Sequence, residues 1–70
     1  MNSFDLPVPG GIYRHKRTGN QYLVEGTLPI KLNGEWIEHG VTIYVDDKMC
    51  HSYARLTPEF LESFEFVEES

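Results

Sequence analysis

Two short turns, each set between runs of aromatic and β-branched residues, constrain the fold of this chain more than any other feature. Thr18-Gly19-Asn20 separates residues 12–15 from residues 21–25. Asn33-Gly34 separates residues 30–32 from residues 35–37, and both residues of this pair tolerate the positive φ angles of a type I′ turn. Runs of this kind, joined by tight turns, are typical of antiparallel hairpins. The sequence therefore predicts an all-β fold.

The rest of the chain adds further strands and one helical turn. Residues 41–45 alternate so that Val41, Ile43 and Val45 share one face of a strand, and residues 49–55 predict the next strand. Thr57 and Pro58 suit the N-cap and first position of a short helix, and residues 64–67 predict a last strand. We expect a bend or bulge at Gly26, a bend or a sheet edge at Pro29, and a break at His39-Gly40.

These elements predict a small, strongly bent barrel. Five or six short strands with one helical turn before the last strand favour an SH3-like barrel, and the alternative is a five-stranded sheet curled around the helical turn. Residues 1–10 predict an extended lead-in whose Phe4, Leu6 and Val8 can pack as a loose flap. Residues 11–67 form the single barrel domain, and residues 68–70 are expected to be a frayed acidic tail.

Size and cysteine content predict a thin core that neither a disulfide nor a structural metal stabilises. A chain of 70 residues buries only about 60% of its unfolded surface. The single cysteine, Cys50, cannot form an internal disulfide, and no Cys/His cluster suggests structural zinc. The lone thiol, the absence of a leader-like N-terminus and the lack of a long apolar run predict a cytoplasmic protein outside the membrane. No cofactor is expected.

The charge is acidic and unevenly distributed. The net charge of −5 comes from 11 acidic and 6 basic residues. This balance argues against tight, nonspecific nucleic-acid binding, which depends on Lys and Arg. It leaves open an acidic nucleic-acid mimic, or weak nucleic-acid binding through the basic front. The acidic end comprises Glu59, Glu62, Glu65, Glu68 and Glu69, and the basic front comprises Arg14, Lys16, Arg17 and Lys31.

Catalytic and metal-binding patterns are missing from the sequence. It contains no Gly-rich phosphate loop, no Ser/His/Asp order and no paired carboxylates on a catalytic scaffold. Cys50 and His51 are neighbours on an expected strand, so their side chains point to opposite faces and do not form a dyad. His15, His39, His51 and Cys50 lack the spacing of a metal site. The sequence therefore predicts a protein that is not an enzyme and has no metal site.

A few aromatic and basic residues are the candidate binding residues. Strand alternation places Tyr13 and His15 on one face and Arg14 on the other. Arg14 either pairs with a carboxylate as part of the framework or converges with Arg55 on an anion. Trp36, two residues after the Asn33-Gly34 turn, can be an exposed interface anchor. The tyrosines, Tyr53 among them, either line a groove or cover a thin core.

Several of these residues also carry a resemblance to a protein family. The run Gly11-Ile12-Tyr13-Arg14-His15-Lys16 is followed in order by Gly19, Tyr22, Val24, Gly26, Val41, Tyr44, Tyr53-Ala54-Arg55 and Pro58-Glu59-Phe60-Leu61-Glu62. Over residues 10–67 this order resembles a family of small bacterial and phage proteins that form a domain of unknown function. The resemblance implies a small cytoplasmic domain, often encoded by a phage or prophage, and implies no reaction.

Together these observations predict a non-catalytic, cytoplasmic protein-binding module. We expect its contact surface to include Tyr53, Arg55, Trp36 and the Tyr13–His15 edge, and modulation of a host factor is one role that such a surface could have. The alternative is a domain for a small anionic ligand or a nucleotide that uses Arg14, His15 and Arg55. Open strand edges and a thin core also favour self-association.

Overall fold

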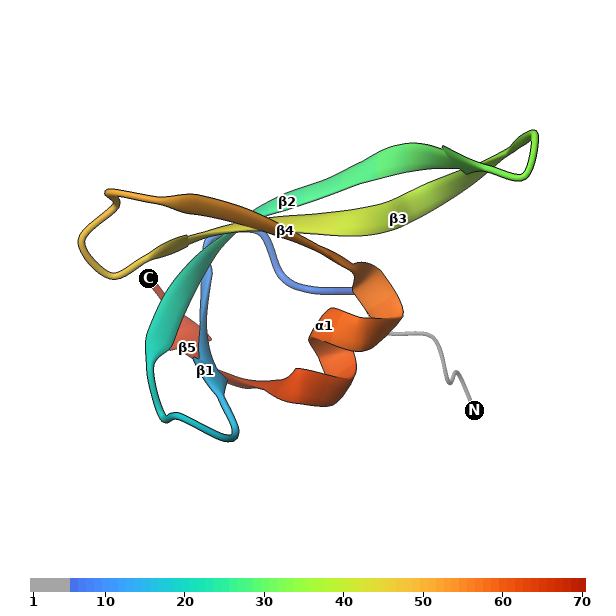
Figure 1. Cartoon of the computed structure of the whole chain (residues 1–70). Helices are drawn as coiled ribbons and strands as arrows, with labels where there is room; N and C mark the ends of the chain where they lie inside the picture. The colour runs from blue at the N-terminus through green and yellow to red at the C-terminus, as the bar shows by residue number, and fades with distance from the viewer. Residues whose placement is uncertain (1–5) are drawn as a thin grey trace.

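Five antiparallel strands and one short helix make up the described part of the chain. The computed structural model describes residues 6–70. The strands form one sheet in the order β4-β3-β2-β1-β5 (Figure 1). The predicted all-β class and the short helix before the last strand are confirmed. In chain order the elements are β1 (Gly11–His15), β2 (Gln21–Leu32), β3 (Glu35–Asp46), β4 (Ser52–Leu56), α1 (Thr57–Ser63) and β5 (Phe64–Glu69).

The sheet curls without closing. β4 and β5 are its two edges, and within residues 6–70 they do not pair with each other. Figure 1 shows β1, β5 and the first part of β2 turned away from the layer that contains β3 and β4, with α1 inside the bend. The described residues therefore form an open, curled sheet around a helix, which is the alternative architecture considered from the sequence, and the expected barrel closure is not seen.

β2 and β3 are longer than the sequence suggests because their irregular residues are bulges within continuous strands. The pairing register shifts between Val24 and Gly26, and again between Leu28 and Ile30. The second shift lies opposite His39, whose φ is positive. The expected break at His39-Gly40 was therefore wrong. Beyond the second shift the hairpin pairs with no other strand among the described residues, and it projects from the molecule (Figure 1). We call residues 28–40 the arm.

The turn at the tip of the arm has the geometry expected from its sequence. Asn33 has a φ of 51° and Gly34 a φ of 82°. Positive φ at both central residues is what a type I′ turn requires, and asparagine and glycine accept it at low cost. Strand pairs continue directly beside the turn, with Leu32 opposite Glu35.

The core lies between the inner face of the sheet and α1. Its buried residues come from four strands and from the helix, and the Phe60 and Phe64 rings stack at a centroid distance of 4.2 Å. Phe60 is fully buried and also contacts the Tyr13 and Tyr44 rings. Aromatic rings therefore fill most of the small core. The cluster comprises Tyr13, Val24, Tyr44, Phe60 and Phe64.

The side of the sheet opposite the core is also apolar. Val41, Ile43 and Val45 share a face as predicted, and the core-facing neighbours on the same strand are Thr42 and Tyr44. Val41 and Ile43 are partly exposed on the outer face, whereas Val45 is 6% exposed. The clean alternation of residues 41–45 therefore identified a shared face, and that face is the outer one.

The start of α1 differs from the prediction. Leu56 occupies the N-cap position with no side-chain hydrogen bond, and Thr57 is the first helical residue. Thr57 is buried, and its hydroxyl lies 2.9 Å from the hydroxyl of Thr42. The expected Thr57 cap was wrong because β4 leads directly into the helix and turns this hydroxyl inward. Pro58 lies in the first turn, as predicted.

Both ends of the described chain are tied to the sheet. The backbone N–H of Val8 donates to the Tyr13 hydroxyl at 2.9 Å, and that of Ser70 donates to the Gly10 carbonyl at 3.0 Å. β5 continues through Glu69, so residues 68–69 are paired strand where the sequence predicted a frayed tail. Residues 1–5 of the expected lead-in, including Phe4, lie outside the described residues. Within residues 6–70 no helix is long and apolar enough to cross a membrane.

Candidate functional site

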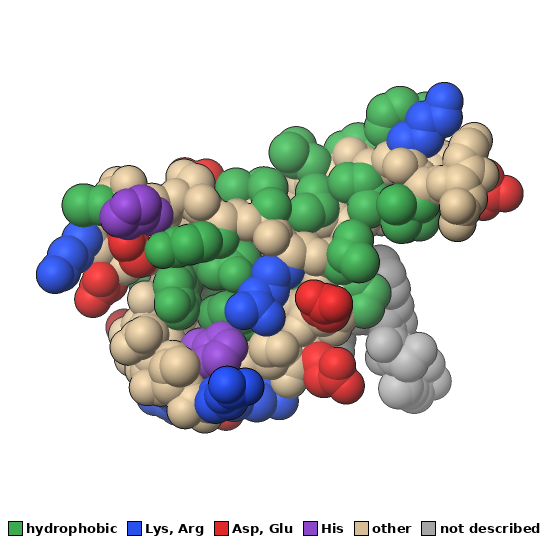
Figure 2. Space-filling view, viewed as in Figure 1, with side chains coloured by type: hydrophobic (Ala, Val, Ile, Leu, Met, Phe, Trp, Pro, Cys, Tyr) green, Lys and Arg blue, Asp and Glu red, His purple; other side chains and the backbone are tan. Residues whose placement is uncertain are grey.

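A groove of about 630 Å³ separates the arm from α1. We call it the apolar groove, because most of its lining side chains are hydrophobic. Figure 2 shows hydrophobic side chains running from the body of the molecule onto the arm. The lining residues from the arm are Ile30, Leu32, Ile37, Glu38, His39 and Gly40, and the others are Leu6, Leu56, Thr57, Pro58 and Leu61.

Strand register places the apolar side chains of the arm on the groove side. Ile30 pairs with Ile37, and Leu32 pairs with Glu35, so these four side chains share one face of the hairpin. Gly40 allows the arm to bend here, because a Cβ at this position would lie 2.6 Å from Cγ1 of Ile30 and 2.9 Å from the Ile37 carbonyl oxygen. A side chain at this position would push the arm out of its present shape.

The charges around the apolar groove are negative. Glu38 lines the groove, and Glu35 lies beside Leu32 on the same face of the arm. No Lys or Arg is among the described residues that line it. His39 contributes an imidazole ring whose Nδ1 lies 2.7 Å from the Thr27 hydroxyl. The groove therefore combines an apolar floor with an acidic border.

Trp36 lies on the face of the arm that is turned away from this groove. It pairs with Lys31 across the hairpin, and the Lys31 ammonium lies 5.9 Å from the centre of its ring. The Trp36 side chain is 67% exposed. Its expected role as an interface anchor stays a prediction. Figure 1 shows the tip of the arm and the β3–β4 turn at opposite ends of the molecule, so Trp36 does not share a surface with Tyr53.

A second hollow, of about 400 Å³, lies on the inner side of the sheet between β4 and the β1–β2 turn. We call it the basic pocket. Arg55, from β4, donates from Nε to the Tyr44 hydroxyl at 2.8 Å and lies over the Phe64 ring, with its Cζ 5.2 Å from the ring centroid. The pocket is lined by His15, Lys16, Arg17, Thr18, Arg55, Glu62 and Ser63.

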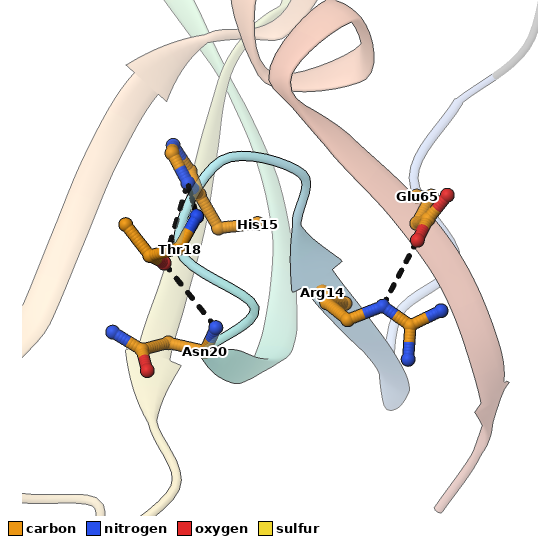
Figure 3. Close-up of polar contacts among 5 residues, drawn as sticks. All are labelled: Arg14, His15, Thr18, Asn20 and Glu65. Atoms are coloured by element: carbon orange, nitrogen blue, oxygen red, sulfur yellow. Dashed lines mark hydrogen bonds and ion pairs between the residues drawn. The ribbon is translucent and has the colours of Figure 1, made fainter.

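Hydrogen bonds hold the β1–β2 turn on the other side of the basic pocket. The Gly19 N–H donates to the His15 carbonyl at 2.8 Å, and the Thr18 N–H donates to His15 Nδ1 at 3.3 Å. The Thr18 hydroxyl in turn accepts from the Asn20 N–H at 3.2 Å (Figure 3). The Lys16 N–H donates to the Ser63 carbonyl at 2.9 Å and joins this turn to the end of α1. Both walls of the pocket are therefore fixed by the fold.

The structure separates the three expected residues of the first strand. Tyr13 is 5% exposed and its hydroxyl accepts from Val8, so it is a core residue rather than part of a contact surface. Arg14 points to the outer face, where its Nε donates to Glu65 at 2.9 Å, and Figure 3 shows it directed away from His15. Arg14 therefore does not converge with Arg55, and its framework interpretation agrees with this ion pair.

His15 and Arg55 do line the same pocket, although they come from different strands. The sequence did not assign Lys16 and Arg17 to this site, because a turn residue gives no strand face from which its direction can be read. The sequence also missed the apolar groove. Its hairpin signal at Asn33-Gly34 was clear, but nothing in the pattern showed that the hairpin extends beyond its neighbouring strands.

Tyr53 lies next to the β3–β4 turn, which is organised by a carboxylate. Asp46 Oδ1 accepts from the Cys50 N–H at 2.9 Å, and this hydrogen bond is the main reason why the pKa of Asp46 is below its usual value. Asp46 Oδ2 lies 3.3 Å from His51 Nδ1. The pKa of Tyr53 is raised, first by desolvation and next by the charge of Asp46. Cys50 contacts the Lys48 carbonyl, and no hydrogen bond joins it to the His51 ring in the described residues.

Clusters that could hold a metal ion do not occur among residues 6–70, where no three His, Cys, Asp or Glu side chains come together in a suitable group. The chain was also compared with models of protein families, with curated proteins and with solved structures, and none of these comparisons gives a match. The resemblance seen in the sequence therefore stays a prediction.

Proposed function

We propose that this protein is a non-catalytic module that binds another protein through the apolar groove. The occupant is an extended segment of the partner, apolar in its middle and flanked by Lys or Arg. The observation that carries the proposal is the groove itself, about 630 Å³ between the arm and α1 and lined mainly by hydrophobic side chains. Exposed apolar surface of this kind on a small protein marks an interaction site.

The unpaired edge of the arm supports an extended occupant. β4 pairs with β3 from Val41 to Val45 and ends there, so the backbone of residues 35–40 has β2 as its single strand neighbour in the described chain. A segment of a partner can add to such an edge and place alternate side chains in a neighbouring groove. Leu56 and α1 lie where those side chains would be received.

The charges near the groove support basic flanks in the partner. Glu38 and Glu35 border the groove, no described cation lines it, and the net charge of the protein is −5. Complementary charge steers association and disfavours acidic competitors. We also propose, from the sequence alone, that the protein is SH3-like in fold, cytoplasmic, and encoded by a phage or prophage.

Fluorescence anisotropy with two labelled peptides tests the groove. Both peptides alternate Leu and Ser, and one is flanked by Lys and the other by Glu. We expect the Lys-flanked peptide to bind more tightly and to shift the backbone NMR signals of the arm and α1. Ile37→Lys should weaken this binding by about tenfold or more, because it places a charge in the apolar floor.

Trp36→Lys is the matched control, because it changes the opposite face of the same hairpin and should leave the peptide affinity unchanged. Loss of binding in Trp36→Lys with normal binding in Ile37→Lys would assign the interface to the other face. Absence of peptide binding at millimolar concentration would contradict the proposal. Dimerisation of the free protein that Ile37→Lys abolishes would show that a second copy occupies the groove instead.

A further inference from the structure

The basic pocket concentrates positive charge in an otherwise acidic protein. Lys16, Arg17 and Arg55 line it together with one acid, Glu62, whereas the whole chain has a net charge of −5. The ion pairs within residues 6–70 are Arg14–Glu65 and His51–Asp46, so none of the three pocket cations has a described carboxylate at ion-pair distance. Such a pocket attracts an anion from solution.

Arg55 is held in place without a ligand. Its Nε donates to the Tyr44 hydroxyl at 2.8 Å, and its guanidinium carbon lies 5.2 Å from the centre of the Phe64 ring. These two contacts fix the plane of the guanidinium and leave its terminal N–H groups without a hydrogen-bond partner among the described residues. Paired N–H donors in one plane match two oxygens of a phosphate group.

The β1–β2 turn supplies further donors. Because Nδ1 of His15 accepts from the Thr18 N–H, the proton of the neutral ring is on Nε2, on the side of the ring away from this bond (Figure 3). Ser63 contributes a hydroxyl from the end of α1. The ring of His15 packs edge-on against Phe64 at 4.9 Å, which holds it beside Arg55.

An exposed aromatic ring extends the pocket along β4. Tyr53 lies two residues before Arg55 and therefore on the same face of the strand. It is 42% exposed and stacks on Tyr44, the residue that accepts from Arg55. A further hollow of about 350 Å³ is lined by Tyr53 and by polar and charged residues, namely Asn20, Gln21, Asp46, Asp47 and Lys48, together with Tyr22. Tyrosine rings offer a surface on which a nucleobase can stack.

We propose that the basic pocket binds the phosphate monoester of a mononucleotide, with the base against Tyr53. Arg55 holds two phosphate oxygens, Lys16 and Arg17 supply charge, and His15 Nε2–H donates to a third oxygen. This site is independent of the apolar groove, since the two share no lining residue. Nucleotide binding therefore neither requires nor excludes the peptide binding proposed above.

Calorimetric titration of the full chain at low salt tests this site with the four 5′-monophosphates, their nucleosides, inorganic phosphate and O-phosphotyrosine. We expect a nucleotide to bind more tightly than inorganic phosphate and the nucleosides not to bind. Arg17→Ala and Arg55→Lys should each weaken nucleotide binding by about tenfold, through a lost charge and a lost paired contact. Tyr53→Ala should weaken nucleotide binding and leave phosphate binding unchanged.

Arg14→Ala is the matched control, because Arg14 is a cation of the same hairpin on the outer face. Its nucleotide affinity should equal that of the unaltered protein. An equal loss in Arg14→Ala and Arg17→Ala would overturn the site in favour of general charge attraction. Equal affinity for inorganic phosphate and nucleotides, tighter binding of O-phosphotyrosine, or no binding at millimolar nucleotide would each overturn the nucleotide assignment.

Discussion

Two buried hydroxyl groups show how a single residue changes its role with its surroundings. Thr57 has the sequence position of a helix cap, yet its hydroxyl lies 2.9 Å from that of Thr42 in the core. Thr42 is fully buried and Thr57 is 5% exposed, so neither hydroxyl can readily turn to water. Each is satisfied by the other, because no buried side-chain N or O atom in residues 6–70 lacks a partner.

This pair predicts strongly non-additive substitutions. Thr42→Val should lower the free energy of unfolding by about 1–3 kcal/mol, because it leaves the Thr57 hydroxyl buried without a partner. The double variant Thr42→Val/Thr57→Val should regain most of this loss, since both polar groups are then gone. Urea unfolding of the unaltered protein, the single variants Thr42→Val and Thr57→Val, and the double variant measures the coupling. Additive losses in the double variant would show that the hydroxyl pair contributes little.

The carboxylate of Asp46 makes the stability of the β3–β4 turn depend on pH in the acid range. Its pKa is below the usual value of 3.8, first because the carboxylate accepts from the Cys50 N–H. The unfolded chain therefore takes up this proton more readily, so the stabilisation is complete above the unfolded pKa and is lost as the pH falls through the folded one. We expect the NMR titration of the Asp46 carboxyl to have its midpoint below 3.8 and exchange of the Cys50 amide to accelerate in the same range.

Asp46→Asn separates charge from hydrogen bonding in this turn, because the amide oxygen can still accept from Cys50. The pKa of Tyr53 should fall in this variant, since the charge of Asp46 is one cause of its increase. It should stay above 10.0, because desolvation, the larger cause, is unchanged. Ultraviolet titration of the tyrosines measures this difference. An unchanged Tyr53 pKa would contradict the coupling.

At the scale of elements, the position of α1 depends on one ring. Phe60 has no exposed surface, stacks on Phe64 and contacts Tyr13 and Tyr44. A seven-residue helix has little stability of its own, so its packing against the sheet keeps it folded. The walls that α1 contributes to both the apolar groove and the basic pocket therefore depend on this contact.

Phe60→Ala should destabilise the protein by about 3–5 kcal/mol, which is much of the stability of a small domain. Phe66→Ala is the comparison, because Phe66 loses the same atoms from a ring that is 49% exposed and contacts Tyr13 at 5.4 Å. Its loss should be clearly smaller. Urea midpoints followed by circular dichroism give both values. Equal losses would mean that α1 does not depend on the Phe60 contact.

The elements also show what the sequence could and could not predict. Alternating residues and turn residues determine strands locally, so the hairpins at Gly19 and Asn33-Gly34 and the helix at Pro58 were predictable. The bulge that the sequence allows at Gly26 is confirmed by the register shift there, whereas His39-Gly40 looks like a break locally and only its pairing across the sheet keeps the strand continuous. The sites arise from distant elements: Arg55 meets the turn after β1, and Leu61 meets the arm. A local sequence pattern does not predict which distant elements come together at a site.

For the molecule as a whole, the open sheet leaves two strand edges exposed to other chains. β4 is only five residues long, whereas β5 pairs with β1 along one edge, leaves its other edge open, and carries Glu68 and Glu69 at its end. Acidic side chains on an edge strand oppose pairing with another copy, since like charges would be brought together. The acidic end therefore has a physical role that requires neither nucleic-acid mimicry nor a partner.

Removing this protection should cause self-association. Glu68→Gln/Glu69→Gln changes the net charge from −5 to −3, because two negative charges are lost. Glu25→Gln/Glu59→Gln reaches the same net charge at exposed positions away from the β5 edge. We expect sedimentation velocity to show concentration-dependent association in the first variant and a monomer in the second. Equal association would assign the effect to net charge, and no association in either would show that these glutamates do not protect the edge.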